Sequence, residues 1–252
     1  MNDETMLYQL QVLRDKHNIK SMLFFGGEPM IRSALVFEAM DLFESSSIVT
    51  NGTYGIPSVP GHLVTVSLDG PEEPNDAIRG EGVFQAVKKA IFERDPGDGT
   101  TVMLQMAITR ENQEYMEEFV KSVADWPIDG VAFTFYVPDK NDATGLGWND
   151  LEERDEVVKK LIDLKRKYPF IKANTGALEL MFSDVAIEST GDDGEHCVLK
   201  KDSLPIYMGE GGQFERTFCC YGNNVDCSRC GAYAVFNRAY HQALQDERET
   251  YG

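Results

Sequence analysis

Five cysteines lie in the last quarter of the chain, at spacings that suit a metal site. They are Cys197, Cys219, Cys220, Cys227 and Cys230. Two residues separate Cys227 from Cys230, and the glycine that follows permits a tight turn, so both sulfurs can reach one metal centre. Cys197 and Cys220 complete a set of four ligands, with Cys219 as a spare or as an alternative to Cys220. Four sulfur ligands suit zinc or an iron–sulfur cluster, and spacing alone does not choose between them.

Polar and small residues that can bind a small ligand follow four apolar segments of the chain. The four groups are Gly26-Gly27-Glu28, Thr50-Asn51-Gly52, Ser67-Leu68-Asp69-Gly70 and Thr109-Arg110-Glu111-Asn112. The carboxyl ends of parallel strands meet at one edge of a sheet, and α/β proteins bind their ligands there. We therefore expect the four groups to surround one cavity.

The surrounding sequence alternates between strand and helix patterns from residue 3 to about residue 168. Strands are expected near 22–25, 47–53, 63–70, 101–109 and 130–138, and helices near 3–16, 31–43, 83–94, 113–125 and 151–167. This alternation predicts parallel βα units with right-handed crossovers. The first strand is apolar throughout and is expected to be buried on both faces. Asp3 is the expected N-cap of the first helix.

The same patterns divide the chain into two parts. Residues 1–175 are expected to form the α/β part, and residues 176–252 a cysteine-rich extension that ends in a helix near 232–248. The extension carries all five cysteines, whose clustering in a cytoplasmic protein indicates a metal or redox site rather than structural disulfides.

Composition excludes several function classes. The 252 residues include 42 acidic and 24 basic side chains, a formal net charge of −18. Such a field repels phosphate backbones, so nucleic acid is not an expected partner. No apolar run reaches the length of a transmembrane segment. The first residues lack the pattern of a secretory signal, and the cytoplasm is the expected location.

The order and spacing of the strand-end motifs resemble those of the radical S-adenosylmethionine enzymes over roughly residues 1–140. The motifs are Phe25-Gly-Gly-Glu-Pro29, Thr50-Asn-Gly-Thr53 and Ser67-Leu-Asp-Gly-Pro71, followed by Asn75-Asp76, Ile78-Arg-Gly80 and Gly82-Val-Phe84. The resemblance implies an α/β fold, namely a partial (β/α)6 barrel of the TIM type that lacks its first strand. It also implies an enzyme in which a [4Fe–4S] cluster and S-adenosylmethionine generate a 5′-deoxyadenosyl radical. A reductant protein is implied as a partner, and a small molecule, a peptide or a lipid remains open as the substrate.

The resemblance assigns cofactor-binding roles to the matched positions, while the catalytic residues remain unassigned. These positions are Gly26, Gly27, Glu28, Pro29, Thr50, Asn51, Ser67, Asp69, Arg79 and Asn112. The glycine carbonyls and the Glu28 carboxylate would hold the methionine ammonium of S-adenosylmethionine. Arg79 would neutralise the carboxylate of that cofactor, or form a salt bridge that braces the glycine-rich loop. Asn112 would contact the ribose or adenine, or serve as a helix N-cap.

One departure from the family pattern concerns the catalytic cluster. Family members usually bind it with a Cys-x3-Cys-x2-Cys loop before the first helix, whereas residues 1–196 contain no cysteine. Such a cluster needs thiolate ligands. The expectation is therefore a truncated chain, or a member that naturally lost the loop, which is inactive by itself. The late cysteines resemble the auxiliary-cluster extension of the family, which favours iron–sulfur over zinc.

A second interpretation belongs to a different functional class. The chain would be a non-catalytic barrel that binds a nucleotide-like ligand or a partner, with structural zinc at the cysteines. Metal analysis separates the two interpretations, because iron together with sulfide indicates the enzyme and zinc alone indicates the binding protein.

Overall fold

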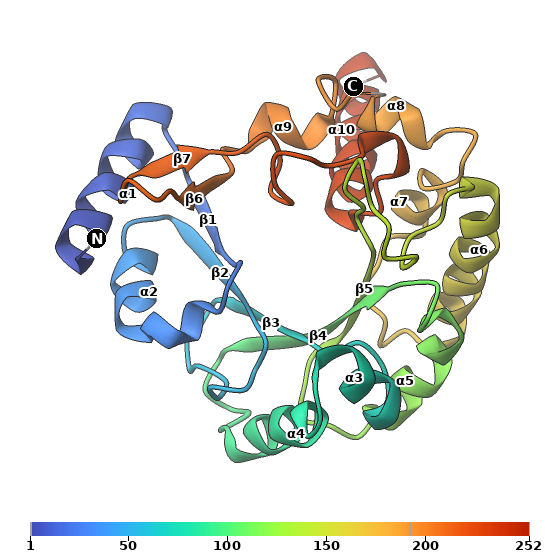
Figure 1. Cartoon of the computed structure of the whole chain (residues 1–252), viewed down its shortest axis with the longest axis horizontal. Coiled ribbons are helices and arrows are strands. Elements are labelled where there is room, and N and C mark those ends of the chain that lie inside the picture. The colour runs from blue at the N-terminus through green and yellow to red at the C-terminus, as the bar shows by residue number, and fades with distance from the viewer. Residues whose placement is uncertain (1, 192, 252) are drawn as a thin grey trace. The chain divides into compact units, whose positions relative to one another are not determined.

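Five short apolar segments form the strands of a single parallel sheet in the computed structural model, which describes residues 2–191 and 193–251. The strands are β1 (Ser21–Phe24), β2 (Ser45–Thr50), β3 (Leu63–Ser67), β4 (Thr101–Ile108) and β5 (Gly130–Phe135). They lie in the order β1-β2-β3-β4-β5 (Figure 1). The predicted α/β fold is therefore confirmed, with every expected strand present.

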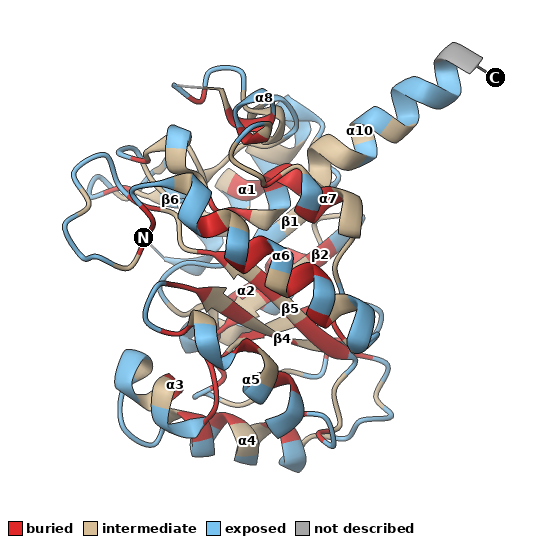
Figure 2. Ribbon diagram, turned by 90° about the vertical axis from the view of Figure 1, so that its right-hand side faces the viewer, coloured by how far each residue is buried: buried red, intermediate tan, exposed pale blue. Residues whose placement is uncertain are grey.

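Alternation of side chains gives the central strands one fully buried face. In β3, Val64 and Val66 are completely inaccessible to solvent, and in β4 Val102 and Leu104 are equally buried. Residues two apart on a strand point to the same face, so these side chains share one side of the sheet. The parallel register pairs Val64 with Val102 and Val66 with Leu104. Figure 2 shows the buried residues concentrated along the strands.

The expectation for the first strand was wrong in one respect. β1 was expected to be buried on both faces, but Leu23 is 47% exposed and the following Phe25 is 43% exposed. The reason is its place at the end of the strand order, where β2 is its paired neighbour in the described sheet. An edge strand is covered by fewer elements than a central one.

The helices complete the βα alternation and extend it. In chain order they are α1 (Asp3–His17), α2 (Ser33–Met40), α3 (Glu72–Arg79), α4 (Val83–Glu93), α5 (Met116–Ser122), α6 (Leu151–Lys167), α7 (Thr175–Glu179), α8 (Ala186–Thr190), α9 (Val198–Asp202) and α10 (Tyr233–Tyr251). Short 3₁₀ turns are η1 (Pro29–Arg32), η2 (Gln113–Tyr115) and η3 (Cys227–Arg229), and a hairpin comprises β6 (Ile206–Met208) and β7 (Phe214–Arg216). The sequence patterns did not indicate α3, α7, α8, α9 or the hairpin. The N-cap of α1 is Asn2 and not Asp3, since the Asn2 side chain accepts a hydrogen bond from Thr5 N at 2.9 Å.

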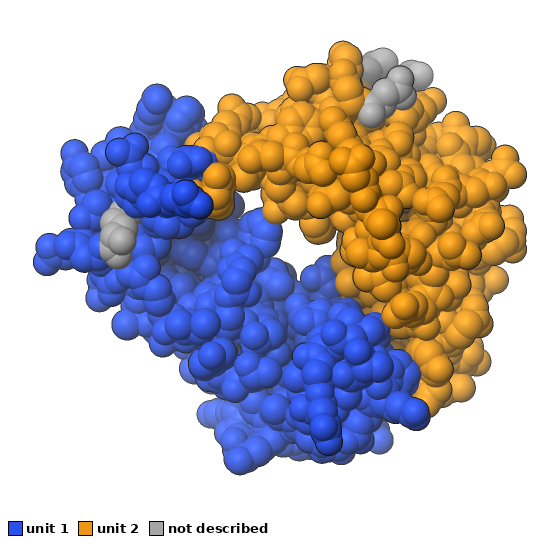
Figure 3. All heavy atoms as spheres, in the orientation of Figure 1, with its two compact units in different colours: residues 1–105, 122–131, 208–215 blue, residues 106–121, 132–207, 216–252 orange. Residues whose placement is uncertain are grey.

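The chain divides into two compact units, coloured separately in Figure 3. The first comprises residues 1–105, 122–131 and 208–215, and the second comprises residues 106–121, 132–207 and 216–252. In the second unit α6 packs on α7, and α10 contacts α7, α8 and α9. The boundary expected at residue 175 falls within the second unit, and the domain division stays a prediction. Among the described residues, no helix is both long and apolar enough to cross a membrane.

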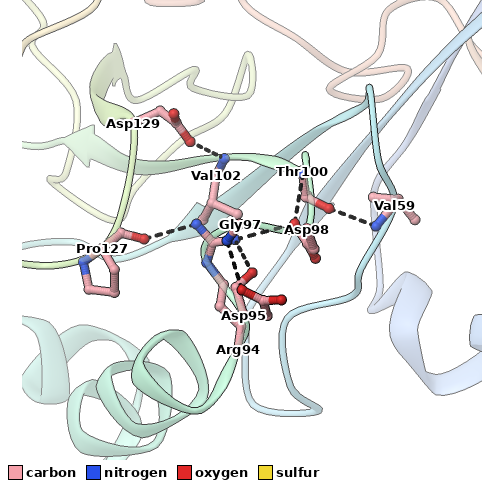
Figure 4. A network of polar contacts seen from close by, with 9 residues as sticks. All are labelled: Val59, Arg94, Asp95, Gly97, Asp98, Thr100, Val102, Pro127 and Asp129. Carbon is pink, nitrogen blue, oxygen red and sulfur yellow. Dashed lines mark hydrogen bonds and ion pairs between the residues drawn. The ribbon is translucent and has the colours of Figure 1, made fainter.

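A polar network in the first unit braces the amino end of β4 (Figure 4). Asp129 accepts a hydrogen bond from Val102 N at 2.7 Å through its side chain, and its own backbone N donates to Val102 O at 2.8 Å. Arg94 donates to Pro127 O at 2.9 Å and lies 3.7 Å from the Asp98 carboxylate. These contacts lie at the amino ends of the strands, where residues of βα folds usually contribute stability rather than ligand binding.

Candidate functional site

The three motifs of the first unit follow β1, β2 and β3 directly, and these strands pair in parallel. Their carboxyl ends therefore lie at one edge of the sheet, as expected for Glu28 and Asp69. We call this the strand-edge site. It comprises residues 26–28, 50–51 and 67–69.

Glu28 lies at the centre of the strand-edge site. One oxygen of its carboxylate accepts hydrogen bonds from Met30 N at 2.9 Å and from the Thr50 hydroxyl at 2.8 Å. The other oxygen accepts from Asn51 N at 2.7 Å. These donors are neutral, and no lysine or arginine of the described chain forms an ion pair with Glu28. The carboxylate is thus held rigidly while its negative charge remains available to a cationic ligand.

Space is open beside Glu28. Gly26 and Gly27 have φ angles of +81° and +55°, a left-handed conformation that favours glycine. A β-carbon built on either residue would meet no other heavy atom within 4 Å. The pair therefore combines a required backbone conformation with room for a ligand to approach the main chain.

The loop after β3 is held by residues of the third motif. Asp69 is 5% exposed, and its carboxylate lies 2.8 Å from Nε of Arg79. The Asn75 side chain, fully buried, accepts a hydrogen bond from Asp69 N at 2.9 Å. The salt bridge offered as the alternative role of Arg79 is therefore confirmed, and a direct contact of Arg79 with a cofactor stays a prediction. The motif residues after Asp69 fix the position of Asp69 itself.

Asp76 has a similar supporting role at the start of α4. Its carboxylate accepts hydrogen bonds from Gly82 N at 2.7 Å, from Phe84 N at 2.8 Å and from the Asn75 amide at 3.0 Å. Burial alone would raise the pKa of Asp76, but the hydrogen bonds from Phe84, Asn75 and Gly82 hold that pKa below its ordinary value. Asp76 thus joins α3 to the amino terminus of α4.

Asp76→Asn is expected to lower the melting temperature at neutral pH, because the amide is a weaker acceptor for these donors. A depressed native pKa stabilises the fold above the unfolded pKa of about 4, and the contribution is lost as pH falls through the native value. The difference between the wild type and the variant should therefore shrink below about pH 4. Melting curves from pH 2.5 to 7 measure this effect, with the exposed Glu81→Gln as control. An equal difference at every pH would contradict it.

Asn112, the fourth strand-end residue, belongs to the second unit and closes the turn after β4. Its side-chain oxygen accepts from Thr109 N at 2.7 Å, and its amide donates to Ala107 O at 2.9 Å. It stands at the N-cap position of η2, but its side chain makes no capping bond there. The expected N-cap position of Asn112 is therefore confirmed, but its side chain bonds within the turn instead of capping η2. Contact of Asn112 with the ribose or adenine stays a prediction.

A cavity in the second unit is lined by all five cysteines, and we call it the cysteine cavity. Its other lining residues are Thr190, Gly194, Leu199, Lys200, Ser203, Pro205, Phe218, Tyr221, Val225, Ala232 and Val235. The wall is mainly apolar, and Lys200 is the only charged side chain in this lining. Lys200 Nζ lies 3.8 Å from the centre of the Phe218 ring and 3.4 Å from the Glu195 carboxylate.

Local backbone structure presents the thiols to the cavity. Cys197 precedes α9, and Cys227 begins η3, where Cys230 N donates to Cys227 O at 3.3 Å. Gly194 has φ +74°, and a β-carbon there would collide with the Cys227 sulfur. Gly194 therefore permits both the turn and the approach of that sulfur. No sequence pattern indicated a role for this glycine.

The thiols differ in their protonation energetics. Burial raises the pKa of Cys227 to about 11 and that of Cys230 to about 12. Cys219 and Cys220 have sulfurs 3.9 Å apart. Their mutual hydrogen bond lowers the pKa of Cys219 and raises the pKa of Cys220. A metal that binds Cys227 and Cys230 would have to displace their protons, as thiolate sites generally require.

Arg154 of α6 binds the backbone of Cys230 through a hydrogen bond of its guanidinium group. Its guanidinium donates to Cys230 O at 2.8 Å and to Met181 O at 2.6 Å, and the residue is 1% exposed. Burial lowers the pKa of Arg154, partly offset by the nearby Cys230 and Asp155. No sequence pattern indicated the role of Arg154, because a charged residue in an amphipathic helix ordinarily faces solvent.

Comparisons with known proteins find two relatives that match part of the sequence. No known family profile matches the chain. Mycofactocin maturase MftC of Mycolicibacterium smegmatis is 29% identical over 150 residues, which cover 55% of this chain and 37% of that protein. An uncharacterized protein of Archaeoglobus fulgidus is 28% identical over 127 residues, 47% of this chain and 30% of that protein. The chain thus spans between a quarter and two fifths of these curated relatives.

Solved structures share the fold. Native anSMEcpe with bound AdoMet matches with a TM-score of 0.55 and 20% identity, over 73% of this chain and 58% of that one. SuiB of Streptococcus suis bound to S-adenosylmethionine matches with a TM-score of 0.50 and 16% identity, over 71% of this chain and 45% of that one. The chain is therefore similar to a radical S-adenosylmethionine maturase over part of its sequence, and it shares the fold of structures that bind S-adenosylmethionine.

The residues of the strand-edge site would fit the ammonium end of S-adenosylmethionine, the ligand named with the matched anSMEcpe and SuiB structures. Glu28 offers a carboxylate that forms no ion pair in the described part of the chain, and Gly26 and Gly27 leave the main chain accessible. The cysteine cavity fits a thiophilic metal by its donor set. Its thiols share one cavity, although no three His, Cys, Asp or Glu side chains of the described residues are already arranged around a single metal ion.

Proposed function

We propose that this chain is a radical S-adenosylmethionine protein that binds S-adenosylmethionine at the strand-edge site, as part of an enzyme that abstracts hydrogen from an unreactive carbon. The observation that carries the proposal is the Glu28 carboxylate, which three neutral donors hold next to open glycine backbone. An ammonium group beside this carboxylate would form a charge-assisted hydrogen bond. Thr50, Asn51, Ser67 and Asp69 lie in the segments that would contact the ribose and carboxylate of the cofactor.

The chain's own residues would orient the cofactor and leave the radical chemistry to it. Asp69 is held in place by Arg79 and Asn75, so the loop after β3 would form a rigid side of the cofactor site. Thr50 and Asn51 are tied to Glu28, which couples the ends of β1 and β2. S-adenosylmethionine, when reductively cleaved, supplies the 5′-deoxyadenosyl radical. A reductant protein is the partner that this chemistry requires.

We propose further that the cysteine cavity holds an iron–sulfur cluster through Cys197, Cys220, Cys227 and Cys230. Support comes from the five thiols that share one mostly apolar cavity. Such surroundings protect a cluster and tune its potential. The alternative ligand is zinc, which the same donors suit. Iron and acid-labile sulfide in the anaerobically purified chain would support the cluster, whereas zinc without sulfide would support the alternative.

A peptide is the substrate class that the relatives favour. MftC is named a maturase, and anSMEcpe is also known with bound AdoMet and the Cp18Cys peptide. We expect a pool of short synthetic peptides to change the intrinsic fluorescence of the cofactor-bound chain. Phospholipid vesicles and free nucleosides should have no such effect, and a response confined to either of them would contradict the peptide assignment.

The cofactor proposal is tested by equilibrium dialysis of the chain against S-adenosylmethionine, 5′-methylthioadenosine and ATP. Methylthioadenosine keeps the adenosine and the sulfur but lacks the aminocarboxypropyl group with its ammonium and carboxylate, and it carries no sulfonium charge. We expect it to bind about 10- to 100-fold more weakly than S-adenosylmethionine, which corresponds to one charge-assisted hydrogen bond. Equal affinities would contradict the role of Glu28. Preferential binding of ATP would support the non-catalytic nucleotide-binding alternative.

A further inference from the structure

A buried positive charge contacts the backbone of Cys230, a residue that lines the cysteine cavity. The Arg154 side chain on α6 is 1% exposed, and its two terminal nitrogens donate to the backbone oxygens of Cys230 and Met181. Cys230 lines the cavity, so the guanidinium is bonded to the same residue that presents a thiol to it. The Phe135 ring lies 5.9 Å from the guanidinium carbon and gives this charge an apolar neighbour.

This guanidinium forms no ion pair in the described part of the chain, although the Asp155 carboxylate is near enough to offset slightly the lowering of its pKa by burial. No Asp or Glu there forms an ion pair with Arg154, and its Nε has no hydrogen-bond partner. The adjacent Asp155 carboxylate is bound instead by the backbone N of Ser183 at 2.9 Å and by the hydroxyl of Ser183 at 2.6 Å. Buried charges in proteins are normally paired or neutralised. Two carbonyl contacts orient the arginine but do not balance its charge.

A thiolate-bound metal centre would supply the missing negative charge. Four thiolates around zinc, or around a [4Fe–4S] cluster, give a net anionic centre. We propose that Arg154 is the counter-charge of this centre and thereby sets its metal affinity and its reduction potential. This inference rests on the proposed metal role of the cysteine cavity. Arg154 acts on the centre through Cys230 and is a positioning residue.

The proposal fixes the sign of two effects. A nearby positive charge favours the anionic centre over the empty thiols, so Arg154 should strengthen metal binding. One-electron reduction by an external reductant such as dithionite makes the centre more negative, and the same positive charge favours the reduced form. The attraction is strong because the surroundings have a low dielectric constant. Loss of the charge should therefore weaken metal binding and move the midpoint potential to more negative values.

A merely structural role predicts something different. Arg154 also ties α6 to the backbone at residues 181 and 230, so its removal would lower stability whatever the cavity contains. A clamp that lacks electrostatic influence would leave the midpoint potential of the loaded centre unchanged. The potential thus separates the two roles.

The test compares Arg154→Gln, Arg154→Lys and the control Arg166→Gln in the full chain. Arg166 lies on the same helix with 65% of its side chain exposed, and its replacement changes the net charge equally. The chains are loaded with iron and sulfide, or with zinc in a separate arm. Chelator competition measures the affinity, and an EPR-monitored dithionite titration of the iron form measures the potential.

We expect Arg154→Gln to bind metal about 10- to 100-fold more weakly, the usual effect of losing an outer-shell partner, and to have a more negative potential. Arg154→Lys retains the charge and should keep a potential close to that of the wild type, as should Arg166→Gln. An unchanged potential in a folded Arg154→Gln overturns the proposal. If that variant does not fold, a folded Arg154→Lys with a clearly shifted potential overturns it, and a retained potential supports it. A wild type that binds neither metal contradicts the proposed role of the cavity itself.

Discussion

Replacement of both Cys227 and Cys230 by alanine is expected to reduce metal loading from about one centre per chain to background, the largest effect we anticipate at any site. Cys227 begins the 3₁₀ turn η3 and Cys230 directly follows it, and both residues line the cysteine cavity. Their removal takes away two of the four proposed ligands. Cys219 is the single spare thiol in the cavity, so it cannot replace both. The measurement is iron, sulfide and zinc per chain after anaerobic reconstitution, together with the visible absorbance spectrum.

Cys219→Ala is the matched control, because Cys219 lines the same cavity but is the spare thiol of the proposed ligand set. It should retain most of the metal. Full loading of the Cys227→Ala/Cys230→Ala chain would show that the metal lies elsewhere. Loss of loading in Cys219→Ala together with retention in Cys220→Ala would exchange the roles of these neighbours, whose sulfurs lie 3.9 Å apart.

Glu28→Gln is expected to weaken S-adenosylmethionine binding by about 10- to 100-fold, because it removes the negative charge that is proposed to bind the ammonium group of the cofactor. The side chain keeps its size, so the space beside Gly26 and Gly27 remains. Equilibrium dialysis measures the affinity at low and at moderate salt. The loss should be smaller for methylthioadenosine, which has no ammonium group to lose.

Glu44→Gln serves as the charge control, since Glu44 also belongs to the first unit and its side chain is 67% exposed beside Lys20. The melting temperature of each variant must be measured as well, because Glu28 accepts from Thr50 and Asn51. An affinity within a factor of two of the wild type, in a folded Glu28→Gln chain, is incompatible with the proposed contact.

The strands were predictable because each is a short apolar run that ends in small or polar residues. Their shared edge followed from the parallel alternation, which needs no long-range information beyond the βα pattern. The same reasoning missed α3, where Pro74 and several acidic residues conceal the helical pattern of Glu72–Arg79. It also overstated the burial of β1, since the position of a strand within a sheet is not encoded in its own composition.

The supporting contacts of the candidate sites were less predictable, because they depend on residues far apart in the sequence. Arg154 bonds to Met181 and Cys230, which are 27 and 76 positions away. The spacing of Cys227 and Cys230 predicted a shared turn but could not predict the apolar wall formed by residues such as Val225 and Val235. Asn75 and Asp76 were recognised as motif residues, yet their roles in holding Asp69 and α4 became apparent only from their hydrogen bonds.

Glu28 has both a proposed cofactor-binding role and a structural role, and this combination affects how such chains evolve. The carboxylate of Glu28, which follows the two glycines in the chain, joins Met30, Thr50 and Asn51 and so links the ends of two neighbouring strands. A descendant that no longer used the cofactor would still gain stability from this residue, and selection for folding alone would retain it. Loss of activity would therefore leave the motif largely intact, and relatives recognised by this signature will include inactive ones.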